Sequence, residues 1–168
     1  DANNALVGNG VSMVTLYYLR RFFSFAIDLF EDLGEKQISI NKPVYDLMDA
    51  LVRALKVREH LLDGPISDEE RRKLMDRFGI AGEHYRTSAY SGFLGHKHQV
   101  NTSDIVAFFS LANKFLEHSI RANKREDHLF HSYNLLTISD DDASYEHLYE
   151  MLEGQVAVLS SKYLPASE

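Results

Sequence analysis

The segment SIRANKREDHLFHSYN, residues 119–134, concentrates the side chains of this sequence that could bind a ligand or do chemistry on it. Arg121 and Arg125 lie four residues apart and would share one face if the preceding helix continues. A pair of guanidinium groups can hold a carboxylate, a phosphate or vicinal hydroxyls. The imidazoles, phenol and amide that follow would add donors and acceptors. The predicted binding residues are Arg121, Arg125, His128, His131, Tyr133 and Asn134.

A structural role would explain the same charges. Arg121, Lys124 and Arg125 would complement the negative end of a helix, and the acidic residues 126–127 would begin a turn. The position of HSYN directly before the apolar LLTI supports the binding-site hypothesis, because polar side chains there would lie at the rim of the core. Both interpretations stay open. We predict that the six residues converge on one concave, partly exposed patch that binds a polyhydroxylated or anionic small molecule.

Metal-binding and catalytic motifs are weak or missing. Four of the eight histidines directly follow a glutamate, but adjacent helical residues point about 100° apart and do not face one ion together. The pairs His96/His98 and His128/His131 have better spacing, yet no third ligand accompanies them. The serine-hydrolase elbow, the phosphate-binding glycine loop and HExxH are also absent. We therefore predict no metal and no cofactor, and the catalytic residues stay unknown.

Composition indicates a single globular domain over residues 1–168, because 45% of the residues are hydrophobic and 26% are charged. The net charge of −7 argues against a nucleic-acid partner, since phosphate would be repelled. The absence of cysteine excludes disulfides and thiolate sites, and we expect a soluble, cytoplasmic protein. Because the sequence begins with Asp1 and not Met, we expect it to be a fragment of a longer protein.

The first predicted helix, residues 11–33, carries apolar residues on nearly every face. It is not a membrane span, because Arg20, Arg21 and Asp28 interrupt it and its apolar runs are far shorter than the roughly 20 residues a bilayer requires. A helix of this kind needs cover on all sides. We expect it to be the central helix, or to contact the remainder of a larger protein or a second copy in a homo-oligomer.

Helical periodicity and capping residues predict an all-α fold, a compact array of five or six helices with one short extended segment. The segment SGFLGHKHQVN, residues 91–101, has two glycines and no period, which predicts a loop. The run LFHSYNLLTIS, residues 129–139, is the extended segment, and we pair it with residues 38–40. Further predicted helices cover residues 43–64, 67–79 and 101–123, with 81–90 as a helical candidate, and the last helix opens at Asp140, Asp141 and Asp142.

Two stretches carry a resemblance to a known group of proteins. SIRANKREDHLFHSYNLL followed by LYEMLEGQVAVLSS resembles a segment of large bacterial proteins labelled cellobiose-phosphorylase-like, and GNGVSMVTLYYLRRF is similar to the same proteins. Those proteins are built around helical toroids that process carbohydrate. The resemblance implies an internal part of a larger catalytic or accessory region that binds a saccharide or a sugar phosphate. A chain of 168 residues is too short for a whole toroid, so no catalytic residue is carried over.

Two alternative functions stay open. The spacings Arg121-x6-His128 and Arg125-x5-His131 resemble the Arg-x(4–6)-His signature of HEPN ribonucleases, which are small all-helical domains. Ala122 stands where that family usually has a polar residue, and the net charge of −7 also argues against RNA binding. The other alternative is a structural or assembly module that makes helix-helix contacts through residues 11–33.

Overall fold

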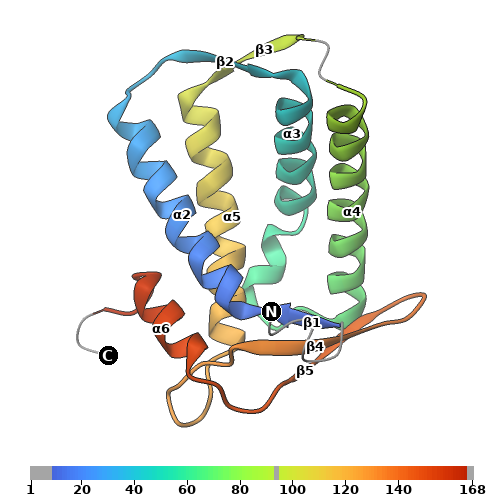
Figure 1. Ribbon diagram of the computed structural model, residues 1–168, viewed down its shortest axis with the longest axis vertical. Helices are drawn as coiled ribbons and strands as arrows, with labels where there is room; N and C mark the ends of the chain where they lie inside the picture. The colour runs from blue at the N-terminus through green and yellow to red at the C-terminus, as the bar shows by residue number, and fades with distance from the viewer. Residues whose placement is uncertain (1–8, 93–94, 166–168) are drawn as a thin grey trace.

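Four long helices of the computed structural model stand side by side, with a three-stranded sheet across one end and a two-stranded ribbon across the other (Figure 1). The structure describes residues 9–92 and 95–165. The long helices match the main helical periods of the sequence, because each buries an apolar face against a neighbour. The helices are α2 (Met13–Asp32), α3 (Lys42–Lys56), α4 (Asp68–Tyr90), α5 (Thr102–Ala122) and α6 (Glu153–Ser160), with a 3₁₀ turn, η1 (Glu59–Asp63).

The two antiparallel sheets make this an α+β fold, so the predicted all-α fold is wrong. The strands have only three to six residues each, too few for their alternation to stand out in a sequence dominated by helical periods. The three-stranded sheet has the order β1-β4-β5, and the ribbon pairs β2 with β3. The strands are β1 (Gly10–Ser12), β2 (Gln37–Asn41), β3 (Lys97–Asn101), β4 (Tyr133–Ile138) and β5 (Ala143–His147).

Strand β4 confirms the predicted extended segment, but its predicted pairing with residues 38–40 is wrong. β4 pairs with β1 on one side and β5 on the other, whereas residues 38–40 pair with residues 98–100. The reason is distance: α2 has 20 residues, and a helix of that length spans about 30 Å. Residues 38–40 therefore lie at the far end of α2 from β4.

The acidic triplet 140–142 forms the turn of the β4–β5 hairpin, so the helix predicted to open there is wrong. Ser139 organises this turn: its hydroxyl oxygen accepts from the backbone N–H of Asp142 at 3.1 Å, and its own N–H donates to the Asp142 carbonyl at 3.0 Å. Short polar side chains compete with helix formation in this way. The last helix, α6, begins only at Glu153.

The predicted helix end at Gly79 and the predicted loop over residues 91–101 are also corrected. A glycine ends a helix when it takes a positive φ; Gly34 does so after α2, at 68°, whereas α4 continues through Gly79 to Tyr90. Backbone pairing with β2 turns residues 97–101 of the expected loop into β3. Residues 93 and 94 of that loop lie outside the described residues.

Two apolar clusters lie along the contact between α2 and α5. The cluster next to the three-stranded sheet contains Tyr17 and Phe130, whose rings meet edge to face. The Tyr17 side chain is fully buried, and its hydroxyl donates to the backbone carbonyl of His131 at 3.0 Å. Burial raises the pKa of this phenol above its ordinary value. The second cluster, around Leu55 and Phe115, joins α3 to α5.

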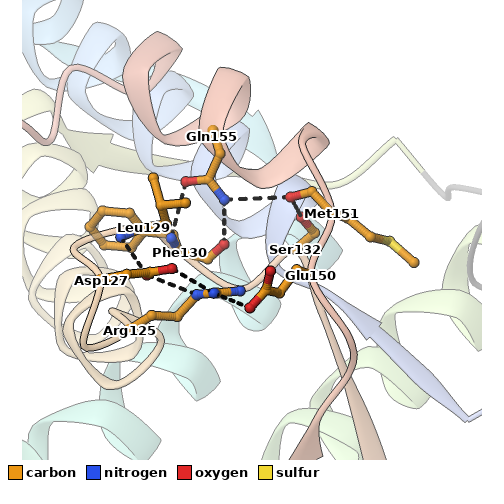
Figure 2. Close-up of polar contacts among 8 residues, drawn as sticks. All are labelled: Arg125, Asp127, Leu129, Phe130, Ser132, Glu150, Met151 and Gln155. Atoms are coloured by element: carbon orange, nitrogen blue, oxygen red, sulfur yellow. Dashed lines mark hydrogen bonds and ion pairs between the residues drawn. The ribbon is translucent and has the colours of Figure 1, made fainter.

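Helix α6 is held against residues 130–132 by a small set of hydrogen bonds (Figure 2). The Gln155 amide accepts from the Phe130 N–H at 3.0 Å and donates to the Phe130 carbonyl at 2.6 Å. The Ser132 hydroxyl donates to the Met151 carbonyl at 3.0 Å and accepts from the Gly154 N–H at 2.8 Å. This contact is so close that a Cβ built on Gly154 would lie 2.6 Å from the Ser132 hydroxyl oxygen.

Substituting Gly154→Ala should destabilise the domain by about 1 to 3 kcal/mol, because the added methyl overpacks this contact. Urea unfolding monitored by circular dichroism measures the loss. Gly79→Ala is the matched control, since nothing lies within 4 Å of a Cβ at that helical position. It should leave stability unchanged or raise it by up to about 1 kcal/mol. Equal stabilities of the Gly154→Ala variant and the wild type would show that α6 does not pack this closely.

Candidate functional site

A mainly apolar cavity of about 340 Å³ lies between the three-stranded sheet and the helices that stand on it. Its walls come from α2, α3, α4, α5 and all three strands of the sheet. Two wall residues, Val11 and Phe78, are 40% and 38% exposed, so the cavity reaches the surface. The apolar wall includes Leu16, Leu55, Leu74, Phe78, Phe115 and Leu136.

A pair of buried asparagines contributes polar groups to this cavity. Asn123 directly follows α5 and Asn134 lies in β4, and both are among the cavity's lining residues. The Asn134 Nδ2 donates to the Asn123 Oδ1 at 2.9 Å, and the Asn123 Nδ2 donates to the Ser119 carbonyl at 2.8 Å. The Asn134 Oδ1 accepts from His147 Nδ1 at 2.8 Å, which assigns the proton to that ring nitrogen. Each amide group keeps a second hydrogen that a ligand could use.

The register of the sheet explains why these residues meet. Asn134 lies opposite Val11 on β1 and opposite His147 on β5, and residues directly opposite in a sheet share one face. Two residues further along β4, Leu136 lies opposite Tyr145 on the same face. Because Val11, Asn134, Leu136 and Tyr145 all line the cavity, this face of the sheet is its floor.

Helix α4 closes one side of the cavity through Arg71. Its guanidinium carbon lies 4.6 Å from the centre of the Tyr145 ring, a cation–π contact with the floor. The same group donates to the Ile66 carbonyl at 3.1 Å and pairs with Asp68. The guanidinium is therefore held in place by the protein and serves as a wall of the cavity.

His147 also stacks on His131, one of the predicted binding residues. The two imidazole rings lie 3.8 Å apart with an interplanar angle of 2°. Burial lowers the pKa of His131, and the nearby Arg125 charge lowers it further. Burial lowers the pKa of His147 as well, and His131 adds to that effect. Both rings are therefore mainly neutral at pH 7, and the His131 Nδ1 is buried without a hydrogen-bond partner in the described structure.

The two predicted arginines do not form a clamp. Figure 2 shows Arg125 held by the carboxylates of Asp127 and Glu150. The Arg125 side chain is only 13% exposed and is engaged by two carboxylates: Asp127 contacts its Nε at 3.0 Å and its Nη2 at 2.6 Å, and Glu150 contacts the same Nη2. These carboxylates raise the pKa of Arg125, and Arg125 lowers the pKa of Asp127. Arg121 lies exposed in the last turn of α5. Neither arginine lines the cavity.

The other predicted residues are divided between different surroundings. His128 is exposed, in the turn after α5, with a left-handed φ of 67°. Tyr133 precedes Asn134 in β4, so the two side chains point to opposite faces of the sheet. The structure thus joins Asn134 and His131 through His147, with Arg125 beside them, and leaves Arg121, His128 and Tyr133 outside that group.

Sequence reasoning missed His147 and Asn123. The hairpin turn was the signal that could have located His147. If residues 139–142 had been recognised as a turn, pairing the residues outward from it on both strands would have placed His147 opposite Asn134. Asn123 was expected only as a helix end. Its contact with Asn134 depends on the path of the chain between the end of α5 and the start of β4, and local sequence patterns do not predict that path.

Over residues 9–92 and 95–165, no group of three or more histidine, aspartate or glutamate side chains is arranged to hold a metal ion. In the same ranges, none of the helices combines the length and the apolar character needed to cross a membrane.

The chain was compared with known proteins. No protein-family model matches it. A search of curated proteins returned no match either.

Lowering the pH should destabilise the domain through the stacked imidazoles. Because the folded-state pKa of His131 and His147 lies below the ordinary value of 6.5, the unfolded chain takes up protons at these residues before the folded one does. The stabilisation is complete above about pH 6.5 and is lost as the pH falls from there towards the folded pKa values. Urea unfolding at about pH 7.5 and about pH 5.5 measures this loss.

The variant His147→Gln should lose less stability between the two pH values than the wild type, because one of the two titrating rings is gone. The matched control is His84→Gln, which removes an exposed histidine on α4. If His147→Gln and the wild type lose equal stability, the stacked pair is not the source of the pH dependence.

Proposed function

We propose that the chain is a ligand-binding domain whose cavity holds a small molecule with an apolar body and one neutral polar group. The observation that carries the proposal is a cavity of about 340 Å³ with mainly apolar walls and an asparagine pair among its lining residues. Small-molecule sites typically have such a volume, mostly apolar walls and a few placed polar groups. Because the cavity reaches the surface beside Val11 and Phe78, a small molecule can enter it.

The polar contacts define the chemical class of the ligand. The Asn123–Asn134 pair offers amide hydrogens and carbonyl oxygens with no net charge, which suits a hydroxyl, a carbonyl or an amide. Arg71 is the cation on the cavity wall, and it already pairs with Asp68 and contacts Tyr145. A neutral polar group is therefore better matched to the site than a carboxylate or a phosphate.

The resemblance to carbohydrate-active bacterial proteins makes a saccharide or a sugar phosphate the alternative ligand. Amide groups such as Asn123 and Asn134 hydrogen-bond readily to sugar hydroxyls, which supports the saccharide. The phosphate has less support, because Arg125 is engaged by Asp127 and Glu150 and Arg121 does not line the cavity.

Ligand-observed NMR and isothermal titration calorimetry test the proposal with three probes: benzyl alcohol, cellobiose and glucose 1-phosphate. Benzyl alcohol combines an apolar ring with one hydroxyl and should bind. Leu74→Trp and Leu116→Trp extend into the cavity from α4 and α5, and each should weaken binding at least about tenfold because the indole takes the space of the ligand.

Leu159→Trp is the matched control, because it makes the same substitution at a residue of α6 that is 65% exposed and outside the cavity. It should bind benzyl alcohol as the wild type does. Thermal unfolding of each variant shows whether the domain is still folded. The proposal fails if benzyl alcohol does not bind, or if folded Leu74→Trp and Leu116→Trp variants bind it unchanged. Binding of cellobiose alone would favour the saccharide.

A further inference from the structure

Helix α2 presents a row of large apolar side chains to solvent on the side turned away from its packing partners. Tyr18, Phe22, Phe25 and Leu29 are 46%, 55%, 61% and 46% exposed. Their spacing of four, three and four residues is that of the apolar positions in a coiled-coil heptad, where such residues form the seam between two helices. A row of apolar residues with this spacing is typical of a helix surface that packs against another helix.

The charges of the residues that flank this row indicate which kind of helix would pack against it. On one side, Arg21 and Asp28 are both exposed and lie seven residues apart, so they occupy the same heptad position with opposite charges. On the other side, the corresponding positions are the apolar Leu19, Ala26 and Leu33. At this heptad position α2 thus carries Arg21 and Asp28, placed on either side of the midpoint between Phe22 and Phe25, and Lys162 adds a second positive charge beside them.

We propose that α2 packs antiparallel against α2 of a second copy of this chain, about a twofold axis that passes between Phe22 and Phe25. In this arrangement Phe22 of each copy meets Phe25 of the other, and Arg21 of each copy lies beside Asp28 of the other. The same attractive pair is therefore made twice, as a self-complementary twofold interface requires. Tyr18 and Leu29 form the outer layers of the seam in the same way.

The charges distinguish the antiparallel arrangement from a parallel one. In a parallel pair of helices, the position of Arg21 faces the position of Ala26 on the partner, so Arg21, whose Nη1 donates to the Ser160 Oγ of its own chain at 2.7 Å, meets no opposite charge across the interface. In the same parallel arrangement, Asp28 faces the apolar Leu33 of the partner helix, five residues further along the sequence. Only the antiparallel register pairs Arg21 with Asp28 across the interface.

A groove beside the row gives the second copy room to pack. It has a volume of about 460 Å³ and runs between α2 and the residues that follow α6. Its wall includes Tyr18, Phe22 and Phe25 together with Arg21 and Asp28, so three of the four residues of the row and both flanking charges border one concave surface. The aromatic side chains of a second α2 can insert there, as knobs do between the residues of a facing helix.

Sedimentation-velocity ultracentrifugation of the whole chain over a range of concentrations tests the proposal. The wild type should dimerise, and Phe25→Glu should abolish the dimer while circular dichroism stays unchanged, because this side chain is 61% exposed in the single chain. Asp28→Arg and Arg21→Asp each create two like-charge contacts, and each should weaken the dimer at least about tenfold. Glu83→Arg, the same kind of charge reversal at an exposed residue of α4, is the matched control and should leave the dimer intact.

Mixing the two charge variants provides the decisive experiment. Arg21→Asp carries two acidic and Asp28→Arg two basic flanking residues, so an antiparallel heterodimer of the two should form with at least wild-type affinity. The proposal is overturned by a wild type that stays monomeric, by a dimer that Asp28→Arg does not weaken, or by charge variants that do not associate when mixed. These outcomes are independent of whether the cavity binds a ligand.

Discussion

The packing of α2 against α5 is the contact on which the rest of the domain depends. The start of α2 and the end of α5 lie at the same end of the pair, because β1 leads into α2 and pairs with β4, which follows α5. The Met13 N–H donates to the Ser132 carbonyl at 2.9 Å at this level. Further along the pair, the rings of Phe23 and Phe109 lie 4.9 Å apart. A strand of three residues such as β1 cannot hold its place alone, so the helices position it.

A polar contact completes this helix pair. Arg20 on α2 reaches the Glu117 carboxylate on α5 at 2.8 Å, and its other terminal nitrogen donates to the Ser161 carbonyl at 2.8 Å. The Arg20 side chain is 16% exposed, and a charge so far from water is stable only when it is paired and hydrogen-bonded. Arg20, one of the charged residues that interrupt the apolar run of the first helix, thus joins α2 and α5 to Ser161, which follows α6.

The cavity follows from how the remaining helices stand on the sheet. Helix α3 packs on α5 through Leu55, and α4 reaches the floor through the Arg71–Tyr145 contact. Their side chains leave space between these contacts, and the buried Asn123–Asn134 pair borders it. The pair is stable because Asn134 Nδ2 donates to Asn123 Oδ1, while Asn123 Nδ2 bonds to the Ser119 carbonyl and Asn134 Oδ1 to His147. The exposed row on α2 lies on the other side of that helix, so a ligand and a second copy of the chain would occupy separate surfaces.

Periodicity in the sequence determined where α2, α3 and α5 lie and that the run 129–139 contains an extended segment, because these features depend on neighbours a few residues away. It also indicated that the first helix has more apolar surface than one neighbour can cover. Tertiary structure decided the rest. Residues 140–142 became a hairpin turn because Ser139 bonds their backbone, and β3 exists only because β2 lies beside it. Asn134 meets Asn123 and His147 across a sheet register, while Arg125 turns to Asp127 and Glu150. Such contacts depend on the distance between segments in space, which helical and strand periods do not encode.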